Sequence, residues 1–439
     1  MKQDRAVNSF PSRQGEHPFM GERSVNPPRT AYVLLWFPKP SETFIFREVV
    51  NLRAMGMPLE VFALYDELTE DMSDEMREAS GDVERIGLKG LKRAVSDWFY
   101  WLKRDRKATL HILREALFRR WKGLEKSGES LWAVLCAATL ARRFVPMGIA
   151  HIHAPWASGP ATAAWVASRL TGIPFSFTAR AWDIYPPDAA LQDKLRDAAF
   201  VRSETRRNID YLKGMCTWDA GKIHLTYNGV PLTEFEEAPV HMRPPYKLLA
   251  LGRFVGKKGY DYLLRACKLL GDSGLDVHLT LAGAGPREKR LKDLSNRLGI
   301  SERVSFPGFV QYDRISSLFR DADVFVMPSV IDSSGDRDGI PTVIMEALLH
   351  RVPVIATNVS GISEVIQDGS TGLLIPEKDA SAIASAVKRM VEDRNRALLT
   401  AELGKERVLE QFNPEKNHRR VFDLYVELVP GSINSRNPR

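Results

Sequence analysis

The feature that most constrains the fold of this 439-residue chain is a repeated alternation of short apolar strands with helix-length segments. A first series begins at Ala31 and ends near Asn228, and a second series starts at Lys247. Strands that alternate with helices in this way form parallel sheets covered by helices on both faces. The sequence therefore predicts an α/β protein with two Rossmann-like, doubly wound domains that face each other across a cleft.

The domain boundaries follow from changes in composition. The N-terminal stretch is rich in Pro, Ser, Arg and Gly without an apolar run, so we expect a disordered tail and not a signal peptide. The last helix is expected to pack back on the first domain. The predicted parts are a tail (1–29), a first Rossmann-like domain (30–235), a proline-rich linker (236–245), a second Rossmann-like domain (246–412), the last helix (413–430) and a second tail (431–439).

Cysteine usage and hydropathy favour a cytoplasmic location. Cys136, Cys216 and Cys267 are far apart and show no CxxC spacing, so they indicate free thiols in a reducing compartment. The longest strongly apolar run, Leu131 to Ala141, is too short to span a bilayer.

One segment carries the whole excess of positive charge. Residues 84–126 hold 13 Lys or Arg and 5 Asp or Glu, a net charge of +8 against +7 for the chain. Such basic, aromatic helices are typical of elements that lie on anionic membranes, at the inner face of the cytoplasmic membrane in this case. A solvated helical hairpin with its aromatic rings in the core is the alternative, and nucleic acid is not expected because no recognised motif accompanies the charge. The aromatic residues of the segment are Trp98, Phe99, Tyr100, Trp101, Phe118 and Trp121.

An acidic, glycine-containing loop runs directly into a helix between Asp338 and Glu346. Pro341 suits the first helical position because its missing N–H would be unpaired there anyway. The free N–H groups and the positive dipole end between the two carboxylates form an anion site. Glu346 could accept hydrogen bonds from two neighbouring hydroxyls, such as those of a ribose. An acidic loop that caps a buried helix is the alternative interpretation.

Basic residues follow a strand at the start of the second domain. Arg253 comes directly after the strand and Lys258 opens the next helix, so both can converge on one anion. For Lys257 a surface position is an equal alternative. The next strand ends in Gly283-Ala284-Gly285-Pro286, a tight turn that lacks the third glycine of a dinucleotide-binding motif.

Together these motifs resemble glycosyltransferase family 4, whose members are retaining enzymes of the GT-B fold. The resemblance covers Tyr32 to Leu428 and is greatest for the members that build exopolysaccharides and lipid-linked glycans. It implies transfer of a hexose from a UDP- or GDP-sugar to a hydroxyl of a glycan or lipid-linked acceptor, without a metal or other cofactor. The further motifs that carry it are Pro40-Ser41-Glu42-Thr43-Phe44-Ile45, His151-Ile152-His153-Ala154, Tyr227-Asn228-Gly229-Val230, Phe306-Pro307-Gly308, Pro328-Ser329 and Thr371-Gly372-Leu373-Leu374.

The resemblance also implies roles for individual residues. Arg253 and Lys258 would bind the diphosphate, and Glu346 would hold the ribose hydroxyls. Asp338 would contact the transferred sugar, and His153 would lie beside the reacting carbon. Backbone groups would contact the sugar and phosphate from Gly339, Ile340, Pro341, Thr342 and Val343, and the base from Gly308, Phe309 and Val310.

Two departures from the family pattern leave other functions open. Asp338 stands where relatives usually have Glu, and Arg180 stands where many have His. The role of Arg180 is therefore unassigned. The alternatives are a nucleotide-sugar epimerase of the same architecture and a membrane-binding pseudo-enzyme scaffold. His151 and His153 face the same way on one strand, but no third metal ligand accompanies them.

Overall fold

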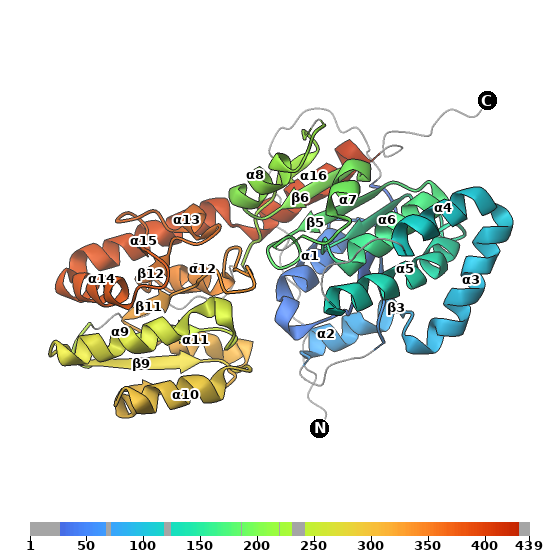
Figure 1. The fold of residues 1–439 in the computed structure, drawn as a ribbon. Helices are drawn as coiled ribbons and strands as arrows, with labels where there is room; N and C mark the ends of the chain where they lie inside the picture. Colours follow the sequence, from blue (N-terminus) through green and yellow to red (C-terminus); the bar gives the residue numbers. More distant parts are fainter. Residues whose placement is uncertain are drawn as a thin grey trace, which may run out of the picture.

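The computed structural model describes residues 27–66, 72–117, 124–185, 187–218, 220–230 and 242–429, which form two α/β domains side by side (Figure 1). The predicted C-terminal tail, nearly all of the N-terminal tail and residues 236–241 of the linker lie outside these ranges, as do Phe118 and Trp121.

The first domain is built on a seven-stranded parallel sheet with the order β3-β2-β1-β4-β5-β6-β7. One face is covered mainly by α3 to α7, and the other by α1, α2 and α16. The edge strand β3 was not predicted, because it is only three residues long and overlaps the start of the basic segment. The elements are β1 (Thr30–Leu34), α1 (Thr43–Ala54), β2 (Leu59–Ala63), α2 (Asp74–Ala79), β3 (Val83–Arg85), α3 (Leu91–Arg104), α4 (Arg106–Leu117), α5 (Leu124–Phe144), β4 (His151–Ala154), α6 (Gly159–Thr171), β5 (Phe175–Ala179), α7 (Leu191–Asp197), β6 (Phe200–Ser203), α8 (Arg206–Gly214) and β7 (Ile223–Leu225).

The second domain has a six-stranded parallel sheet with the order β10-β9-β8-β11-β12-β13. Helices α9, α10 and α14 cover one face, and α11, α12, α13 and α15 cover the other. The elements are β8 (Tyr246–Leu251), the 3-10 turn η4 (Gly256–Lys258), α9 (Tyr260–Asp272), β9 (Val277–Ala282), α10 (Glu288–Arg297), β10 (Val304–Ser305), α11 (Tyr312–Arg320), β11 (Val324–Met327), α12 (Thr342–Leu349), β12 (Val354–Thr357), α13 (Ile362–Val365), β13 (Leu373–Ile375), α14 (Ala380–Glu392) and α15 (Arg394–Gln411).

The last helix, α16 (Pro414–Leu428), lies against the first domain, as predicted (Figure 1). It packs on α1, where the Asn51 side-chain nitrogen is 2.8 Å from Nδ1 of His418. The Tyr425 hydroxyl donates to the Tyr32 hydroxyl of β1 at 3.1 Å, in the buried interior. The first and last described elements, β1 and α16, thus lie in the same domain.

The basic segment forms a helical hairpin of α3 and α4 against α5. Trp98 and Trp101 are buried, and their indole N–H groups donate to the carbonyls of Leu135 and Ala138 on α5. For these two rings the alternative interpretation, a helical hairpin with its aromatic rings in the core, is therefore confirmed. Phe99 lies on the opposite, exposed face. Among the described residues, no helix is both long and apolar enough to cross a membrane.

Candidate active site

The carboxyl ends of β8 to β11 bring the predicted donor residues to one edge of the second sheet. The turn η4 fits against the end of β11 because Gly259 has a φ of +65° and no side chain. A β-carbon there would lie 1.9 Å from the carbonyl oxygen of Pro328. Only glycine tolerates both the positive φ and this close approach, so it fixes the position of Lys258.

Asp338 is the centre of a buried polar cluster at this edge. The ammonium of Lys258 is 3.0 Å from Oδ2 of Asp338, and the Ser329 hydroxyl donates to the same oxygen at 2.8 Å. Lys257 is 3.8 Å from the other carboxylate oxygen. Burial alone would raise the pKa of Asp338, but the two lysines outweigh it and hold the pKa below its ordinary value. Asp338 is therefore a fixed anion next to a fixed cation.

Glu346 lies one turn inside α12 and is buried. Burial raises the pKa of Glu346 to about 7, and a hydrogen bond from Thr342 opposes this effect only in part. Its Oε2 atom is buried and has no hydrogen-bond partner among the described residues. A buried acceptor without a donor is costly, so this oxygen is ready to accept a hydroxyl from a ligand. Pro341 precedes the helix as its N-cap, and α12 begins at Thr342, one residue later than predicted.

Arg253 and the segment after β10 complete this edge. Arg253 is exposed directly after β8, and no hydrogen bond or ion pair joins its side chain to the described residues. The N–H of Gly283, after β9, donates to the carbonyl of Gly308 at 2.8 Å. Phe309 is 69% exposed beside it, which leaves an aromatic ring free to stack. The structure thus brings Arg253, Lys258, Asp338 and the Gly308 segment to the ends of neighbouring strands.

His153 has a different environment from the predicted one. Its ring is fully buried in the first domain, with Nδ1 at 2.7 Å from the Ser176 hydroxyl and Nε2 at 3.1 Å from the Thr178 hydroxyl. The ring also lies 4.8 Å from that of Tyr32. Burial, with the nearby charge of Arg202, holds the pKa of His153 well below its ordinary value. The structure places this neutral imidazole in the core and not at the surface of the cleft, so it does not support the predicted role.

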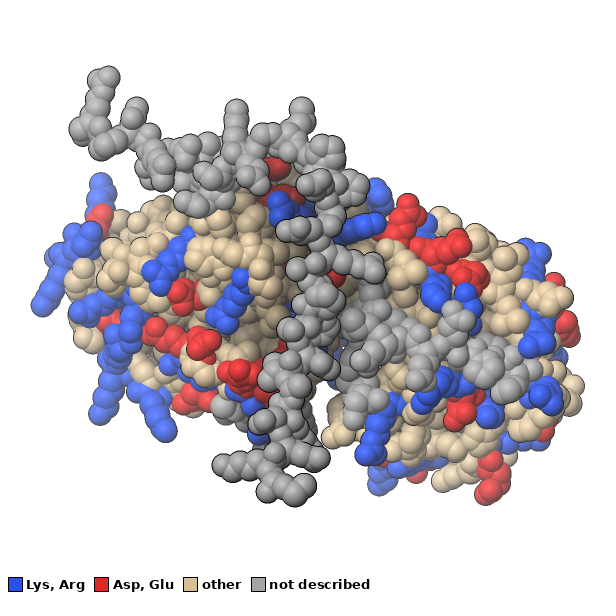
Figure 2. Space-filling model, turned by 180° about the vertical axis from the view of Figure 1, so that it is seen from behind, with Lys and Arg blue, Asp and Glu red and all other residues tan. Residues whose placement is uncertain are grey.

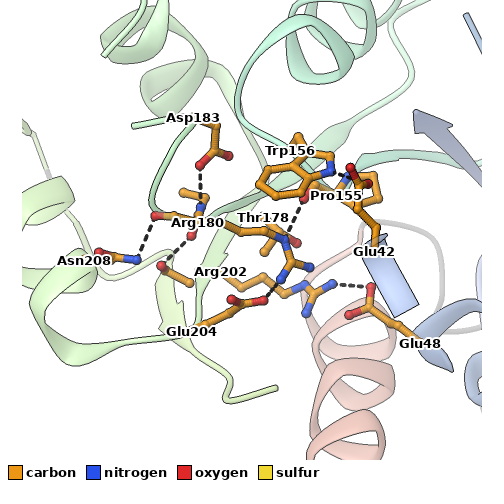
Figure 3. Close-up of polar contacts among 12 residues, drawn as sticks. Glu42, Glu48, Pro155, Trp156, Thr178, Arg180, Asp183, Arg202, Glu204 and Asn208 are labelled. Atoms are coloured by element: carbon orange, nitrogen blue, oxygen red, sulfur yellow. Dashed lines mark hydrogen bonds and ion pairs between the residues drawn. The ribbon is translucent and has the colours of Figure 1, made fainter. Parts of the chain in front are cut away.

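Arg180 is the charged group that the first domain holds at the end of β5 (Figure 3). Its guanidinium lies 4.3 Å from the ring of Phe44 and 5.2 Å from that of Trp156. It pairs with Glu204, which follows β6, and its Nε–H donates to the carbonyl of Pro155 at 3.1 Å. Burial lowers the pKa of Arg180 to about 10, so it stays charged at neutral pH.

The same cluster anchors the loop that follows β5. The two carboxylate oxygens of Asp183 accept from the backbone N–H groups of Arg180 at 2.9 Å and Ala157 at 2.6 Å. Asn208 of α8 donates to the carbonyl of Arg180 at 2.7 Å (Figure 3). Sequence reasoning missed Asp183, Glu204 and Asn208. The only available signal was that Glu204 directly follows an apolar strand, at the edge where a site is expected.

The edges of the two sheets meet close to these groups. A β-carbon at Gly361 would lie 2.4 Å from the Thr205 side chain of the first domain and 2.9 Å from the side chain of Ile340, in the loop that contains Asp338. Glu364 accepts hydrogen bonds from the first domain, from the Arg206 backbone N–H at 2.8 Å and from the Tyr227 hydroxyl at 2.8 Å. The loop that contains Asp338 therefore faces the neighbouring ends of β5 and β6, which carry Arg180 and Glu204.

Two doubly wound domains whose carboxyl edges face each other form the GT-B architecture. Residues 233–407 match the family described as Glycosyl transferases group 1. The chain is 26% identical over 425 residues to a protein of Salmonella typhimurium named as colanic acid biosynthesis glycosyltransferase WcaL, with 90% of this chain and 99% of that protein covered.

Two further similarities agree with this match. The chain is 29% identical to the amylovoran biosynthesis glycosyltransferase AmsK of Erwinia amylovora, over 48% of this chain and 52% of that protein. The solved structure of Anabaena HepE in complex with UDP and glucose has a TM-score of 0.65 at 15% identity, with 90% of this chain and 98% of that chain covered. The prediction of a glycosyltransferase with the GT-B fold is confirmed. Assignment to family 4 and retention at the reacting carbon stay predictions.

Proposed function

We propose that this glycosyltransferase moves a hexose, with retention of configuration, from a UDP- or GDP-sugar to a hydroxyl of a glycan or lipid-linked acceptor in polysaccharide or glycolipid biosynthesis. The observation that carries the proposal is the buried Glu346 carboxylate, which has an unpaired oxygen near the N-terminus of α12. A ribose offers two adjacent hydroxyls that would satisfy such a group. Names of similar proteins that refer to colanic acid and amylovoran support the polysaccharide part.

The charges around the site suit the departure of a nucleoside diphosphate. When the bond between the sugar carbon and the diphosphate oxygen breaks, its electron pair leaves with the diphosphate. Arg253 and Lys258, with the backbone N–H groups at the start of α12, are the fixed positive charges that would stabilise it. The acceptor hydroxyl then forms the new bond on the same face of the sugar, and its proton passes to the leaving phosphate. Asp338, held by Lys258, would bind hydroxyls of the transferred sugar.

Binding of nucleotides tests the donor site. The thermal stability of the purified protein is measured with UDP, GDP and ADP, without and with Glu346→Gln. We expect one nucleotide to stabilise the wild-type protein and to lose this effect in the variant. A nucleotide at 100 times its Kd raises the free energy of unfolding by about 2.7 kcal/mol. An unchanged stabilisation in Glu346→Gln contradicts the assignment of Glu346.

The alternatives are less well supported. The similar proteins that carry a functional name are transferases, so an epimerase is not favoured. Incubation of a nucleotide sugar without acceptor separates the two, because only an epimerase converts the sugar. A scaffold without activity would not need the unpaired Arg253 and Glu346 side chains, and it predicts no stabilisation by any nucleotide.

We also propose that the exposed face of α3 contacts an anionic membrane surface. Large apolar side chains at Leu88, Leu91, Val95 and Phe99 are exposed at spacings of three or four residues, so they lie on one helical face. Figure 2 shows Lys and Arg side chains gathered at this outer end of the first domain. The exposed basic residues of α3 are Lys92, Arg93, Lys103 and Arg104.

Sedimentation with vesicles tests this contact. We expect the protein to bind phosphatidylglycerol vesicles, to bind less at high salt, and to lose binding in the double variant Leu91→Ser and Phe99→Ser. The matched control is Leu269→Ser, which replaces an exposed leucine on α9 of the other domain. Binding that is insensitive to anionic lipid and to salt refutes the proposal.

A further inference from the structure

A second site lies between the domains, next to the loop that contains Asp338. It is a cavity of about 420 Å³ lined by three side chains of the first domain and by a loop of the second. The lining residues are Tyr185, Arg207, Tyr211, Ser334, Gly335 and Arg337. None of them was singled out in the sequence, because they come together only when the domains meet.

The site combines two cations with two aromatic rings. The guanidinium of Arg337 lies 4.3 Å from the ring centre of Tyr185, so it crosses from the second domain to the first. The rings of Tyr185 and Tyr211 are 4.6 Å apart. Arg207 and Tyr211 lie four residues apart on α8 and thus on the same helical face. Arg207 also lies in the first turn of α8, where the helix dipole adds positive character.

Neither arginine has an acidic partner. Among the described residues, no carboxylate lies within 4 Å of the Arg207 or Arg337 side chains, and Nε–H of Arg337 donates to the carbonyl of Gly335 at 3.2 Å. Lys257 and Arg180, by contrast, are paired with Asp336 and Glu204. Two guanidinium groups that share one cavity without a carboxylate among the described residues offer a binding site for an anion from outside the chain.

We propose that this cavity binds the anionic group of the acceptor, namely a phosphate or a carboxylate attached to a sugar. The arginines would bind the anion, and the half-buried ring of Tyr211 would pack against the sugar ring. Arg337 directly precedes Asp338, so the cavity and the residue proposed to contact the transferred sugar share one loop. The inference rests on the proposed function and extends it to the chemical class of the acceptor.

Titration calorimetry with simple sugars tests the inference. The full-length protein is first saturated with the nucleotide that stabilises it, so that the donor site is filled. Glucose 1-phosphate, glucuronate and methyl glucoside are then added to the wild type, to the double variant Arg207→Gln and Arg337→Gln, and to each single variant. The control is Arg265→Gln, which removes an exposed arginine on α9.

We expect an anionic sugar to bind the wild type and Arg265→Gln at least tenfold more tightly than methyl glucoside, and the double variant to lose that preference. A preference for glucose 1-phosphate indicates a phosphate-linked acceptor, and a preference for glucuronate indicates an acidic sugar. Equal affinity of the anion for wild type and double variant, no preference over methyl glucoside, or no binding of any sugar overturns the inference.

Failure of the inference is distinct from failure of the proposed function. If a nucleotide binds but the anion preference does not depend on Arg207 and Arg337, only the acceptor site is refuted. If no nucleotide binds, the proposed donor site is refuted, and titration without nucleotide still decides whether the two arginines bind the anion. Arg207 is exposed, so Arg207→Gln remains informative if the double variant fails to fold.

Discussion

The buried Glu346 carboxylate is expected to lower the free energy of unfolding of the unliganded protein. The same carboxylate is proposed to bind the donor. Its pKa is raised from 4.5 to about 7 by burial, so the folded state binds a proton more tightly than the unfolded state does. The stabilisation that comes from the protonated group is complete below pH 4.5 and is lost as the pH rises through 7. Above pH 7 the ionised, buried carboxylate lowers the free energy of unfolding by about 3 kcal/mol relative to acidic pH, at about 1.4 kcal/mol for each pKa unit.

The variant Glu346→Gln removes this titration. We expect urea unfolding at pH 8 to show a more stable protein than the wild type, by up to about 3 kcal/mol, and the difference to shrink toward pH 5. The control is Glu302→Gln, which changes an exposed glutamate and should not alter the pH dependence. At the same time the variant should lose nucleotide binding, because a charge-assisted hydrogen bond to each ribose hydroxyl is worth about 1.5–3 kcal/mol.

The stability and the nucleotide affinity of Glu346→Gln together test whether Glu346 is held for the donor. A variant that is less stable than the wild type at pH 8 shows that Glu346 has a structural partner and is not held for a ligand. A more stable variant that still binds nucleotide with unchanged affinity shows that the unpaired oxygen has another use. Either outcome refutes the assignment, and only gain of stability with loss of binding supports it.

Three further substitutions have effects that the contacts predict. Gly259→Ala should lower the free energy of unfolding by about 1–3 kcal/mol, since a β-carbon would meet a backbone carbonyl at the end of β11; unchanged urea denaturation contradicts this. Arg180→Met leaves the mostly buried Glu204 without its cation and should cost about 3–5 kcal/mol; the double variant with Glu204→Gln should recover most of the loss, and no recovery refutes the pairing. Tyr425→Phe removes the hydroxyl that donates to Tyr32 and should cost about 1 kcal/mol in the same assay, whereas a neutral result shows that the contact contributes nothing.

Much of the fold could be predicted because strands and helices alternate regularly along the chain in parallel α/β proteins. Buried strands between helices indicated the two sheets, and the last helix, predicted at 413–430, is found at Pro414–Leu428. The donor edge was predictable for the same reason, since Arg253 and Asp338 both follow strands and parallel strands end at one edge. The alternation of strands and helices was therefore sufficient to predict this edge of the second sheet.

The order of strands could not predict which side chains of the first domain face the cleft. Strand β4 is buried on both faces, so alternation could place His151 and His153 on one side but could not tell the core side from the cleft side. For Trp98 and Trp101 the buried face of the helix could not be predicted either, because their basic neighbours do not indicate which rings contact α5. Contacts between the domains, such as those of Glu364, depend on how two separate sheets meet and leave no periodic signal.

The distribution of satisfied and unsatisfied charge distinguishes structural groups from groups held for a ligand. Lys194 is fully buried, yet its ammonium has the Asp188 carboxylate at 2.5 Å and the Ala157 carbonyl as further acceptor, so it needs nothing from outside. Glu346 is buried to a similar degree and lacks a partner for one oxygen among the described residues. Since a protein gains no stability from such a group, its retention at a cleft edge is best explained by a ligand that supplies the missing donor. Arg207 and Arg337 are not buried in this way, but they share one cavity without a carboxylate among the described residues. That shared cavity leads from a donor site in one domain to an acceptor site formed by both.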